Sequence, residues 1–448
     1  MTDIQEVRVS GTAEALKQRV LSREARIGVV GLGYVGLPFA VEKAKVGFQV
    51  MGFDRSEGRV GQVNRGENYI GDVKDEELRD LVAQGLIQAT TDSSLLAQMD
   101  VIVICVPTPL DQNLTPDLSY VKGVTQDIAR HLRPGQLISL ESTTYPGTTE
   151  DIMRPILEQG GLRAGQDFYL AHSPERVDPG NKRYSTKNTN KVVGGNDPAS
   201  LDVAVTFYQQ AIQHIVPVSS AKAAELVKVY ENTFRAVNIA LANEIALLCD
   251  RMGLNVWEVL DAAFTKPFGI MPFYPGPGVG GHCIPLDPHY LEWKAREFNF
   301  QTRFIALAGE VNRRMPEFVV DKAARVLNED RKALNGSRVL LLGMAYKGDL
   351  DDYRESPAIV VYDLLQKAGA DVQFHDSWTP HVREHGLDLH GIDLTDDVVR
   401  EADLVIITTM HSAVDYGHVV GLAKRVLDTR NATRNLSAEE KADKVVML

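Results

Sequence analysis

Short apolar runs alternate with amphipathic segments in the first half of the chain. The stretch RIGVVGLGYVGLPFAVEKAKVGFQVMGFD (26–54) predicts a strand, a glycine turn, a helix and a second strand. Further strand-like runs lie at 101–107, 137–143 and 168–175, with helical patterns between them. Strands that alternate with helices form parallel sheets covered on both faces, so residues 26–219 are expected to form one such domain. Residues 1–25 precede it as a polar extension.

The pattern changes at Ser220. From Ser220 to Met252 the chain has no Gly or Pro, which predicts one helix of about 50 Å. Helical patterns continue to about Leu334, so 220–334 is expected to be a helical middle domain. The long helix should present an apolar stripe, and we expect it to pair in a homodimer. The candidate residues of that stripe are Leu226, Val229, Phe234, Val237, Leu241, Ile245 and Leu248.

A second alternating segment occupies 335–448. SRVLLLGMAYKG, SPAIVVYDLLQKAGA, DVQFHD and ADLVIITTM predict a strand, a helix and two further strands, and KVVML is expected to close the sheet. The predicted fold class is therefore α/β, with two parallel-sheet domains joined by a long central helix and a helical middle domain.

Composition narrows the choice of partners. A net charge of −12 argues against nucleic acid or an anionic membrane surface as the main partner. The three cysteines show no paired spacing and there is no CxxC, so we expect a reducing compartment and no metal. The sequence shows neither a signal peptide nor an apolar run of roughly 18 residues, so a cytoplasmic location is expected.

The glycine turn in the first segment is typical of a dinucleotide site. Gly31 permits a tight turn, Gly33 lets a pyrophosphate approach the backbone, and Gly36 lets the helix pack on the strand. Asp54 ends the second strand, where a carboxylate accepts hydrogen bonds from a ribose. Arg55 follows it, but Asp54 would repel a 2′-phosphate. The sequence predicts a Rossmann-like domain that binds NAD rather than NADP.

Cys283 lies in GPGVGGHCIPLDP (276–288), just after four glycines. Thr143 and Glu175 end predicted strands, where α/β proteins bind ligands, and Lys228 and Asn232 share one face of the long helix. Each has an ordinary structural alternative, since most helical lysines are solvated and most single cysteines pack in cores. A cleft between the first sheet and the long helix would collect all of them, which favours an active site.

Seven motifs together resemble the UDP-glucose/GDP-mannose dehydrogenase family, in the right order from about Arg26 to the C-terminus. They are GLGYVGLP, CVPTP, ESTTYPGTT, SPERVDPGN, ELVKVYENTFRAVNIALANE, GPGVGGHCIPLDP and YKGDLDDYRESPA. The resemblance implies an NAD-dependent nucleotide-sugar 6-dehydrogenase that oxidises a primary alcohol at C6 of a UDP-sugar to a carboxylate. SPER followed by DPGN resembles the branch that acts on UDP-N-acetylhexosamines.

The resemblance also implies the chemistry. Cys283 captures the first product, an aldehyde, as a thiohemiacetal, and a second oxidation gives a thioester that water hydrolyses. Lys228 moves the proton and Asn232 binds the C6 oxygen. Asp287 balances the charge of Lys228 and, with Thr143 and Glu175, assists the water that hydrolyses the thioester. The second sheet domain, which lacks a glycine fingerprint, is expected to bind UDP.

Two groups of binding residues follow from the same resemblance. The cofactor group contains Gly31, Gly33, Tyr34, Val35, Gly36, Asp54, Arg59, Thr108, Thr143 and Arg354. The substrate group contains Glu175, Arg176, Val177, Lys228, Asn232, Arg235, Tyr274, Gly280, Gly281, Tyr346 and Lys347.

One segment departs from the family pattern. The UDP-N-acetylmannosamine enzymes carry His-Pro-Arg where this chain has Lys266-Pro267-Phe268, which disfavours mannosamine. UDP-N-acetylglucosamine is the expected substrate, with UDP-N-acetylgalactosamine or UDP-glucose as alternatives. A 3-hydroxyacid dehydrogenase would need neither Cys283 nor a second α/β domain. A catalytically silent NAD-binding regulator would have no reason to keep Cys283, Lys228 and Asp287 together.

Overall fold

The computed structural model describes residues 11–71, 73–111, 114–177, 183–184, 186–281, 283–384, 386–441 and 443–448. Residues 1–10 of the polar extension and the DPGN motif (178–181) lie outside the described residues. The chain divides into two compact units. Unit 1 contains Met1–Glu231 and Trp293–Asn299, and unit 2 contains Asn232–Glu292 and Phe300–Leu448.

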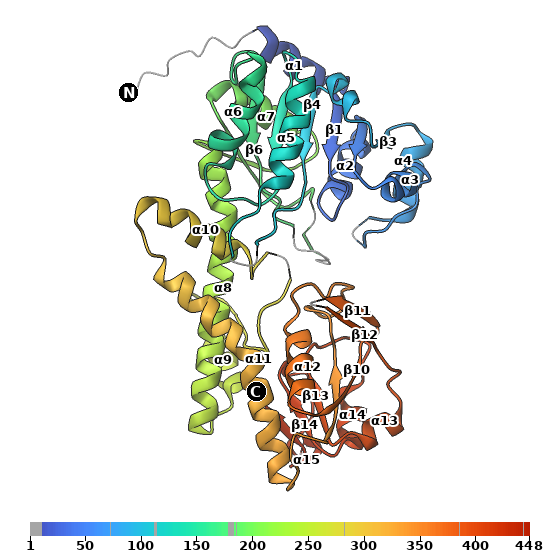
Figure 1. Ribbon diagram of the computed structural model, residues 1–448, viewed down its shortest axis with the longest axis vertical. Helices are drawn as coiled ribbons and strands as arrows, with labels where there is room; N and C mark the ends of the chain where they lie inside the picture. Colours follow the sequence, from blue (N-terminus) through green and yellow to red (C-terminus); the bar gives the residue numbers. More distant parts are fainter. Residues whose placement is uncertain are drawn as a thin grey trace. The chain divides into compact units, whose positions relative to one another are not determined.

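Unit 1 contains an eight-stranded sheet in the order β3-β2-β1-β4-β5-β6-β7-β8 (Figure 1). The strands are β1 Arg26–Val30, β2 Gln49–Phe53, β3 Ile87–Thr90, β4 Val101–Ile104, β5 Leu137–Leu140, β6 Tyr169–His172, β7 Lys191–Gly195 and β8 Ile215–Val218. All neighbouring pairs are parallel except β6 and β7. A parallel pair needs a long crossover, usually through a helix, and no helix lies between β6 and β7 among the described residues. The expected parallel sheet therefore contains one reversal.

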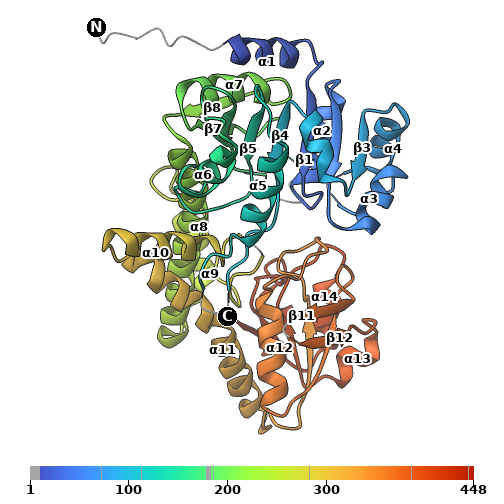
Figure 2. The same cartoon turned by 45° about the horizontal axis from the view of Figure 1, so that its top comes forward.

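Helices cover this sheet. They are α1 Gly11–Leu21, α2 Gly36–Lys45, α3 Glu57–Asn64, α4 Asp75–Ala83, α5 Ser119–His131, α6 Arg154–Leu157 and α7 Pro198–Tyr208, with short helical turns at Ser93–Gln98, Thr148–Met153, Glu158–Gly160 and Arg296–Phe298. Helix α1 lies within the segment expected to be a polar extension, yet its apolar side chains are buried. Ala13, Leu16 and Val20 share a core with Val203 of α7. Helices α1 and α7 lie side by side (Figure 2).

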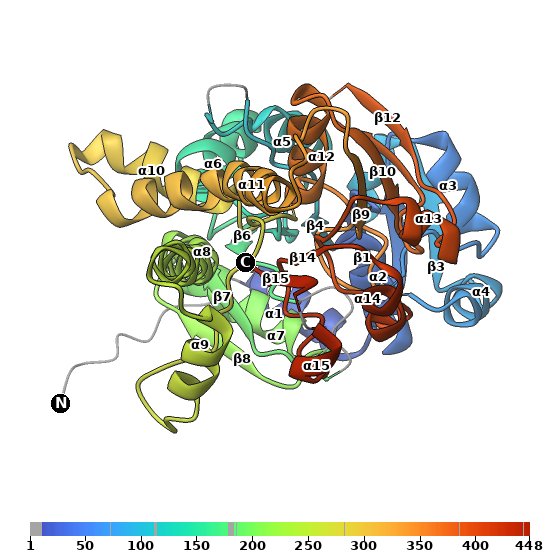
Figure 3. The ribbon, with the colours of Figure 1, turned by 90° about the horizontal axis from the view of Figure 1, so that it is seen from below.

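The long helix predicted over 220–252 is present as α8, Ala221–Met252, seen end on in Figure 3. One residue of the predicted apolar stripe was placed wrongly, because Val229 is fully buried. Tyr230, its neighbour, is 62% exposed instead. The exposed large apolar residues of α8 are Leu226, Tyr230, Phe234, Leu241, Leu248 and Met252.

Unit 2 contains a parallel five-stranded sheet in the order β10-β9-β13-β14-β15. The strands are β9 Arg338–Leu342, β10 Asp371–His375, β13 Leu404–Ile407, β14 Val426–Asp428 and β15 Val445–Met447, and a separate antiparallel hairpin consists of β11 His381–Glu384 and β12 Leu387–His390. The predicted closing strand is therefore the edge strand β15.

Side chains that alternate along β9 divide unit 2 into two cores. Val339 and Leu341 pack with α11 (Arg303–Glu329) and α12 (Pro357–Lys367), which lie side by side (Figure 1). Leu340 and Leu342 pack with α13 (Asp396–Glu401) and α14 (Tyr416–Leu422) on the other face. The remaining helices complete the list: α9 Val256–Phe264, α10 Asp287–Ala295 and α15 Ala438–Lys441.

Candidate active site

The glycine turn connects β1 to α2. Gly31 has φ +94°, and a Cβ there would lie 2.4 Å from the Cys105 carbonyl oxygen. A Cβ on Gly36 would lie 1.8 Å from the Gly31 carbonyl oxygen, so both positions require glycine. Gly33 has open space around it, with no atom within 4 Å of a Cβ added there. An open backbone position at the start of a helix fits a pyrophosphate, and these residues therefore fit NAD.

Asp54 lies directly beside this turn. Its Oδ2 accepts the Leu32 N–H at 3.0 Å and its Oδ1 accepts the Ser56 N–H at 2.9 Å. Arg59, on α3, places a guanidinium nitrogen 3.6 Å from the same carboxylate. Tyr34, at the tip of the turn, is 50% exposed. The structure thus brings together the predicted cofactor residues of the first βαβ unit.

Two predicted threonines meet at the carboxyl edge of the sheet. Thr108 follows β4 and Thr143 follows β5, which is the neighbouring strand. The Thr108 hydroxyl donates to the Thr143 carbonyl oxygen at 2.7 Å.

Glu175 belongs to a buried charge network that the sequence analysis did not anticipate. Its Oε1 accepts the N–H groups of Arg176 and Val177 at 2.7 and 2.8 Å. Its Oε2 accepts from the Lys191 ammonium at 3.1 Å, and that ammonium also contacts Glu141 at 2.6 Å. Lys191 opens β7 and its side chain is 3% exposed.

This network sets the charge of Glu175. Burial alone would raise the pKa of Glu175, but Lys191 and the two backbone amides outweigh burial and hold that pKa below its usual value. The pKa of Lys191 is raised, because two carboxylates outweigh its own burial. Burial raises the pKa of Glu141, which also accepts a hydrogen bond from the Tyr208 hydroxyl at 2.8 Å. Glu175 is therefore held as a carboxylate at neutral pH.

Arg176 turns toward α8. Its guanidinium pairs with both carboxylate oxygens of Glu231 and donates to the Asn190 carbonyl oxygen at 2.6 Å. Because Glu231 occupies its guanidinium, a phosphate or sugar would have to share Arg176 with this carboxylate.

Unit 2 brings together three of the predicted catalytic residues. The Asn232 side chain on α8 donates from Nδ2 to Asp287 at the start of α10, and both residues are buried. The Asp287 N–H donates to the Cys283 carbonyl oxygen at 2.9 Å, so Cys283 precedes α10 by one helical turn. Cys283 is exposed, whereas Cys105 and Cys249 are buried. Lys228 lies one turn before Asn232 on α8.

The glycines before Cys283 are required by packing within unit 2. A Cβ on Gly280 would lie 2.7 Å from the Tyr346 Cβ, and one on Gly281, which has φ +83°, would lie 2.9 Å from the Tyr346 ring. Gly280 and Gly281 thus let the loop pack closely against Tyr346. Asn243 fixes the start of the loop, because its carboxamide oxygen accepts the Gly276 N–H at 3.0 Å.

Two other predicted ligands of unit 2, Arg354 and Tyr274, have protein partners. The Arg354 side chain forms a bidentate pair with Asp352, and its carbonyl oxygen accepts the Gly281 N–H at 3.0 Å. The Tyr274 hydroxyl donates to Asp261 at 2.8 Å. Lys347 is half-buried beside Tyr346, and Arg235 is exposed on α8.

Sequence reasoning missed Lys191, Glu141 and Glu231. The available signals were a lysine at the start of the apolar run KVVGG and a glutamate at the end of the strand-like run LISLE. Buried charges in such runs need partners, so each predicts the other.

Three family domains match the chain in order. Residues 25–212, 222–314 and 340–435 match the NAD binding, central and UDP binding domains of the UDP-glucose/GDP-mannose dehydrogenase family. The chain is 36% identical, over 80% of its length and 83% of the relative, to the UDP-N-acetyl-D-glucosamine 6-dehydrogenase of Pseudomonas aeruginosa. No helix among the described residues is long and apolar enough to cross a membrane.

Solved structures agree with this match. The UDP-D-ManNAc dehydrogenase of Pyrococcus horikoshii superposes with a TM-score of 0.84 at 34% identity, over 93% of this chain and 100% of that one. The NDP-N-acetyl-D-galactosaminuronic acid dehydrogenase of Methanosarcina mazei gives 0.81 at 33% identity, over 96% and 97%. The chain therefore belongs to the UDP-glucose/GDP-mannose dehydrogenase family and is an NAD-dependent nucleotide-sugar dehydrogenase.

Proposed function

We propose that this chain oxidises the C6 hydroxyl of a UDP-N-acetylhexosamine, best UDP-N-acetylglucosamine, to the uronic acid through covalent intermediates on Cys283. The observation that carries the proposal is the place of Cys283. It is the exposed cysteine of three, and it lies one helical turn before Asp287, which is hydrogen-bonded to Asn232. A nucleophile, a carboxylate and an amide donor in one cluster suit capture of a carbonyl carbon.

The first oxidation removes a hydride from C6 and a proton from the C6 hydroxyl. Bound NAD supplies the acceptor for the hydride in each of the two oxidations. Lys228 takes the proton, and the second N–H of the Asn232 amide donates to the C6 oxygen. The product of this step is the C6 aldehyde.

Cys283 then acts on the aldehyde. Its thiolate adds to C6 and the aldehyde oxygen takes a proton from protonated Lys228, which gives a thiohemiacetal. Loss of the second hydride from C6, with transfer of the hydroxyl proton back to Lys228, gives a thioester. Water adds to the thioester carbonyl, and the Cys283 sulfur leaves as a thiolate. The sugar leaves as a carboxylate.

We assign the hydrolytic water to Asp287, with Thr143 and Glu175 in support. Glu175 suits this role only while it is ionised, and Lys191 keeps it ionised.

In Lys191→Met, burial would dominate and raise the pKa of Glu175, so the acidic limb of the kcat/KM profile should move to higher pH. Lys191→Arg should restore the wild-type profile. A Lys191→Met profile with an unmoved acidic limb would remove Glu175 from this role.

The choice of sugar rests on one segment. Lys266, Pro267 and Phe268 replace the His-Pro-Arg expected for a mannosamine enzyme, and Phe268 is 68% exposed. Relatives named for glucosamine, mannosamine and galactosaminuronic acid are similarly identical to this chain in sequence, at 36%, 37% and 35%, so overall identity does not choose among them. We propose glucosamine, with galactosamine or UDP-glucose as the alternatives.

Counting NADH per sugar tests the reaction. The purified chain is incubated with NAD and limiting amounts of each UDP-sugar while NADH absorbance is followed. Two NADH per sugar are expected with UDP-N-acetylglucosamine. One NADH per sugar would indicate a simple alcohol dehydrogenase, and none with any sugar would indicate an NAD-binding regulator.

Removal of the sulfur tests the covalent route. In Cys283→Ser and Cys283→Ala, steady-state turnover should fall by several orders of magnitude while NAD affinity stays near normal, because the thioester cannot form. Mass spectrometry of wild-type enzyme quenched during turnover should find the sugar adduct on Cys283. An adduct on Cys105 or Cys249, or near-normal uronic acid production by Cys283→Ala, would refute the mechanism.

We also propose a homodimer through α8. Its exposed residues Leu226, Tyr230, Phe234, Leu241 and Leu248 recur at helical spacing, and an apolar stripe of this length favours a symmetric partner. Sedimentation at micromolar concentration should show a dimer for wild type and a monomer for Leu241→Glu. A wild-type monomer would refute this proposal.

A further inference from the structure

The hairpin β11–β12 has one apolar and one polar face. Val382 of β11 is fully buried in the core of unit 2, and Leu389, its partner in register on β12, packs against the same core. Alternation along each strand places His381 and Arg383 of β11 on the opposite face, with Asp388 and His390 of β12. The burial of Val382 and Leu389 therefore fixes the register of the polar face.

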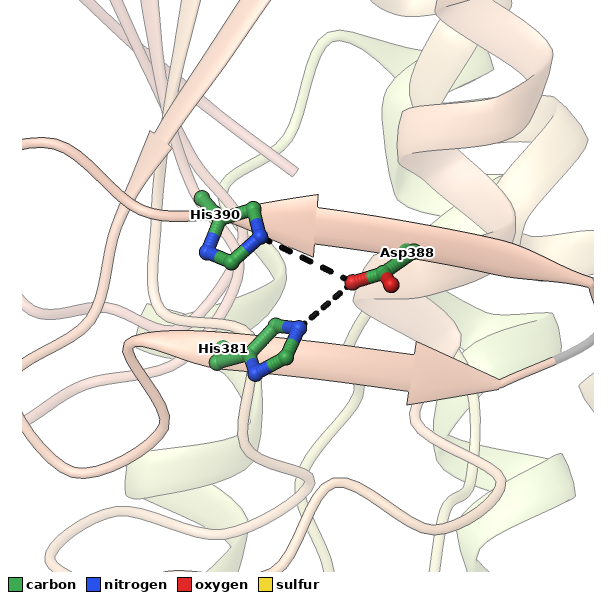
Figure 4. A group of neighbouring side chains, drawn as sticks. All are labelled: His381, Asp388 and His390. Carbon is green, nitrogen blue, oxygen red and sulfur yellow. Dashed lines mark hydrogen bonds and ion pairs between the residues drawn. The ribbon is translucent and has the colours of Figure 1, made fainter.

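Three side chains on that face converge. His381 and His390 are directly opposite in register, and their rings stack with centroids 4.2 Å apart. The His381 Nε2 is hydrogen-bonded to the Asp388 Oδ1, and the His390 Nε2 lies 3.7 Å from the same oxygen (Figure 4). One nitrogen of each imidazole and one carboxylate oxygen all lie within 4.8 Å of one another.

These distances suit a divalent transition metal. Zinc–nitrogen bonds of about 2.0–2.1 Å and zinc–oxygen bonds of about 2.0–2.2 Å place the ligand atoms of a tetrahedral site roughly 3.4 Å apart. The two rings are nearly parallel, at 12°, and an imidazole binds a metal in its own plane, so one ring must turn out of the stack to bring the three ligand atoms to that spacing around one ion. Two imidazoles and one carboxylate form a donor set that Zn²⁺ accepts, with the fourth position left to water.

The other oxygen of Asp388 is held by the protein. Arg383 Nε donates to Asp388 Oδ2 at 3.1 Å, while Oδ1 faces the two imidazoles. Ligating carboxylates in metal sites are commonly fixed by such a second hydrogen bond. We propose that His381, Asp388 and His390 form a Zn²⁺-class metal site on this hairpin. It shares no residue with the proposed catalytic, cofactor or substrate groups.

The chain provides a matched control. His418 Nε2 and Asp396 Oδ1 form an exposed His–Asp pair at 2.8 Å in the same unit, and no third ligand joins them among the described residues. His418→Gln therefore removes an imidazole–carboxylate pair without changing the hairpin.

The experiment measures metal binding on the untagged full chain after treatment with a chelator. Calorimetric titration with Zn²⁺ should show one stoichiometric site in wild type and in His418→Gln. Binding should be at least tenfold weaker in His390→Gln and Asp388→Asn. His390 is 74% exposed in its side chain, so His390→Gln should fold even if Asp388→Asn disturbs the hairpin. Added Zn²⁺ should raise the Tm of wild type and of His418→Gln, but not that of His390→Gln.

The active-site cysteine needs its own control, since a thiolate also binds Zn²⁺. The stoichiometric site should persist in Cys283→Ser, and Co²⁺ bound to the wild type should lack a sulfur charge-transfer band. The proposal is wrong if the wild type has no stoichiometric site or if Cys283→Ser abolishes it. Equal affinity in His390→Gln and His418→Gln would also overturn it.

Discussion

The eight-stranded and five-stranded sheets make the same turn after β1 and β9, respectively, and use it differently. GLGYVG (31–36) follows β1, and GMAYKG (343–348) follows β9. Gly31 and Gly343 have φ +94° and +95°, and each N–H donates to the last residue of the adjacent strand, β2 or β10, at 2.8 and 2.9 Å. In each case an aspartate, Asp54 or Asp376, directly follows that strand and accepts backbone N–H groups of the turn.

The turns differ at the positions that a dinucleotide needs. Gly33 has open space above it, whereas its counterpart Ala345 is fully buried. Helix α2 begins at Gly36 within the first turn, but α12 begins only at Pro357, after a loop that carries Arg354. The same strand topology therefore presents a helix N-terminus to a pyrophosphate in unit 1 and not in unit 2.

The two aspartates differ in how far the protein itself uses them. Asp54 accepts two backbone N–H groups and has Arg59 nearby. Asp376 accepts four, from Met344, Ala345, Trp378 and Thr379, and is also hydrogen-bonded to His411 at 3.0 Å. A carboxylate that already accepts so many hydrogen bonds has little acceptor capacity left for ribose hydroxyls. Asp376 therefore stabilises the turn of unit 2, whereas Asp54 is expected to bind the cofactor.

The largest effect is expected for Asp376→Ala. Removing a buried carboxylate that holds four amides and His411 leaves those donors unsatisfied, and we expect a loss of about 3–5 kcal/mol in the free energy of unfolding of unit 2. Denaturant unfolding followed by a probe in unit 2 measures this. NAD affinity at 25 °C should be unchanged, and Asp54→Ala serves as the matched variant. If Asp376→Ala lowered the free energy of unfolding less than Asp54→Ala does, the contrast between the two aspartates would be wrong.

The same carboxylate predicts the response to acid. Its hydrogen bonds to His411 and the amides outweigh burial and hold the pKa of Asp376 well below 3.8. A depressed pKa contributes stability that is present above the unfolded value and lost as pH falls through the folded value. The free energy of unfolding of unit 2 should therefore fall as the pH drops below about 3.8. In Asp376→Asn it should fall less steeply with pH. The same pH dependence in both proteins would contradict this assignment.

A methyl group at Gly33 should act on the cofactor alone. Nothing lies within 4 Å of the added Cβ, so Gly33→Ala should unfold at the wild-type Tm. The methyl would occupy the position expected for the pyrophosphate, and we expect NAD binding about 100-fold weaker, or roughly 2.8 kcal/mol. Titration calorimetry with NAD measures the affinity. Wild-type affinity in Gly33→Ala would separate this turn from the cofactor.

Asp54→Asn should weaken NAD binding less than Gly33→Ala does. The amide keeps one acceptor oxygen for the backbone but loses the charge that favours two ribose hydroxyl donors. We expect about tenfold weaker NAD binding, or roughly 1.4 kcal/mol, and a narrower preference over NADP. Unchanged preference between the two cofactors would remove Asp54 from the ribose site.

The comparison also shows what the sequence could predict. Both α/β segments, α8 and the glycine turn were predicted from local periodicity and turn residues, and the family from motif order. Lys191, Glu141 and Asp376 were not, because their roles depend on which strands become neighbours. The grouping of His381 with His390 was not predicted either, since these two residues meet only through strand pairing.

The smallest effect is expected for Ala345→Gly, which gives unit 2 the same glycine pattern as unit 1. If a glycine fingerprint alone created a dinucleotide site, this variant would acquire a second NAD site. Asp376 would still be engaged by four amides and α12 would still begin at Pro357, so we expect one NAD per chain by calorimetry, as in wild type. The loss of one buried methyl and the added backbone freedom should lower the stability of unit 2 by about 1 kcal/mol. A second NAD site in Ala345→Gly would show that the middle residue alone separates the two turns.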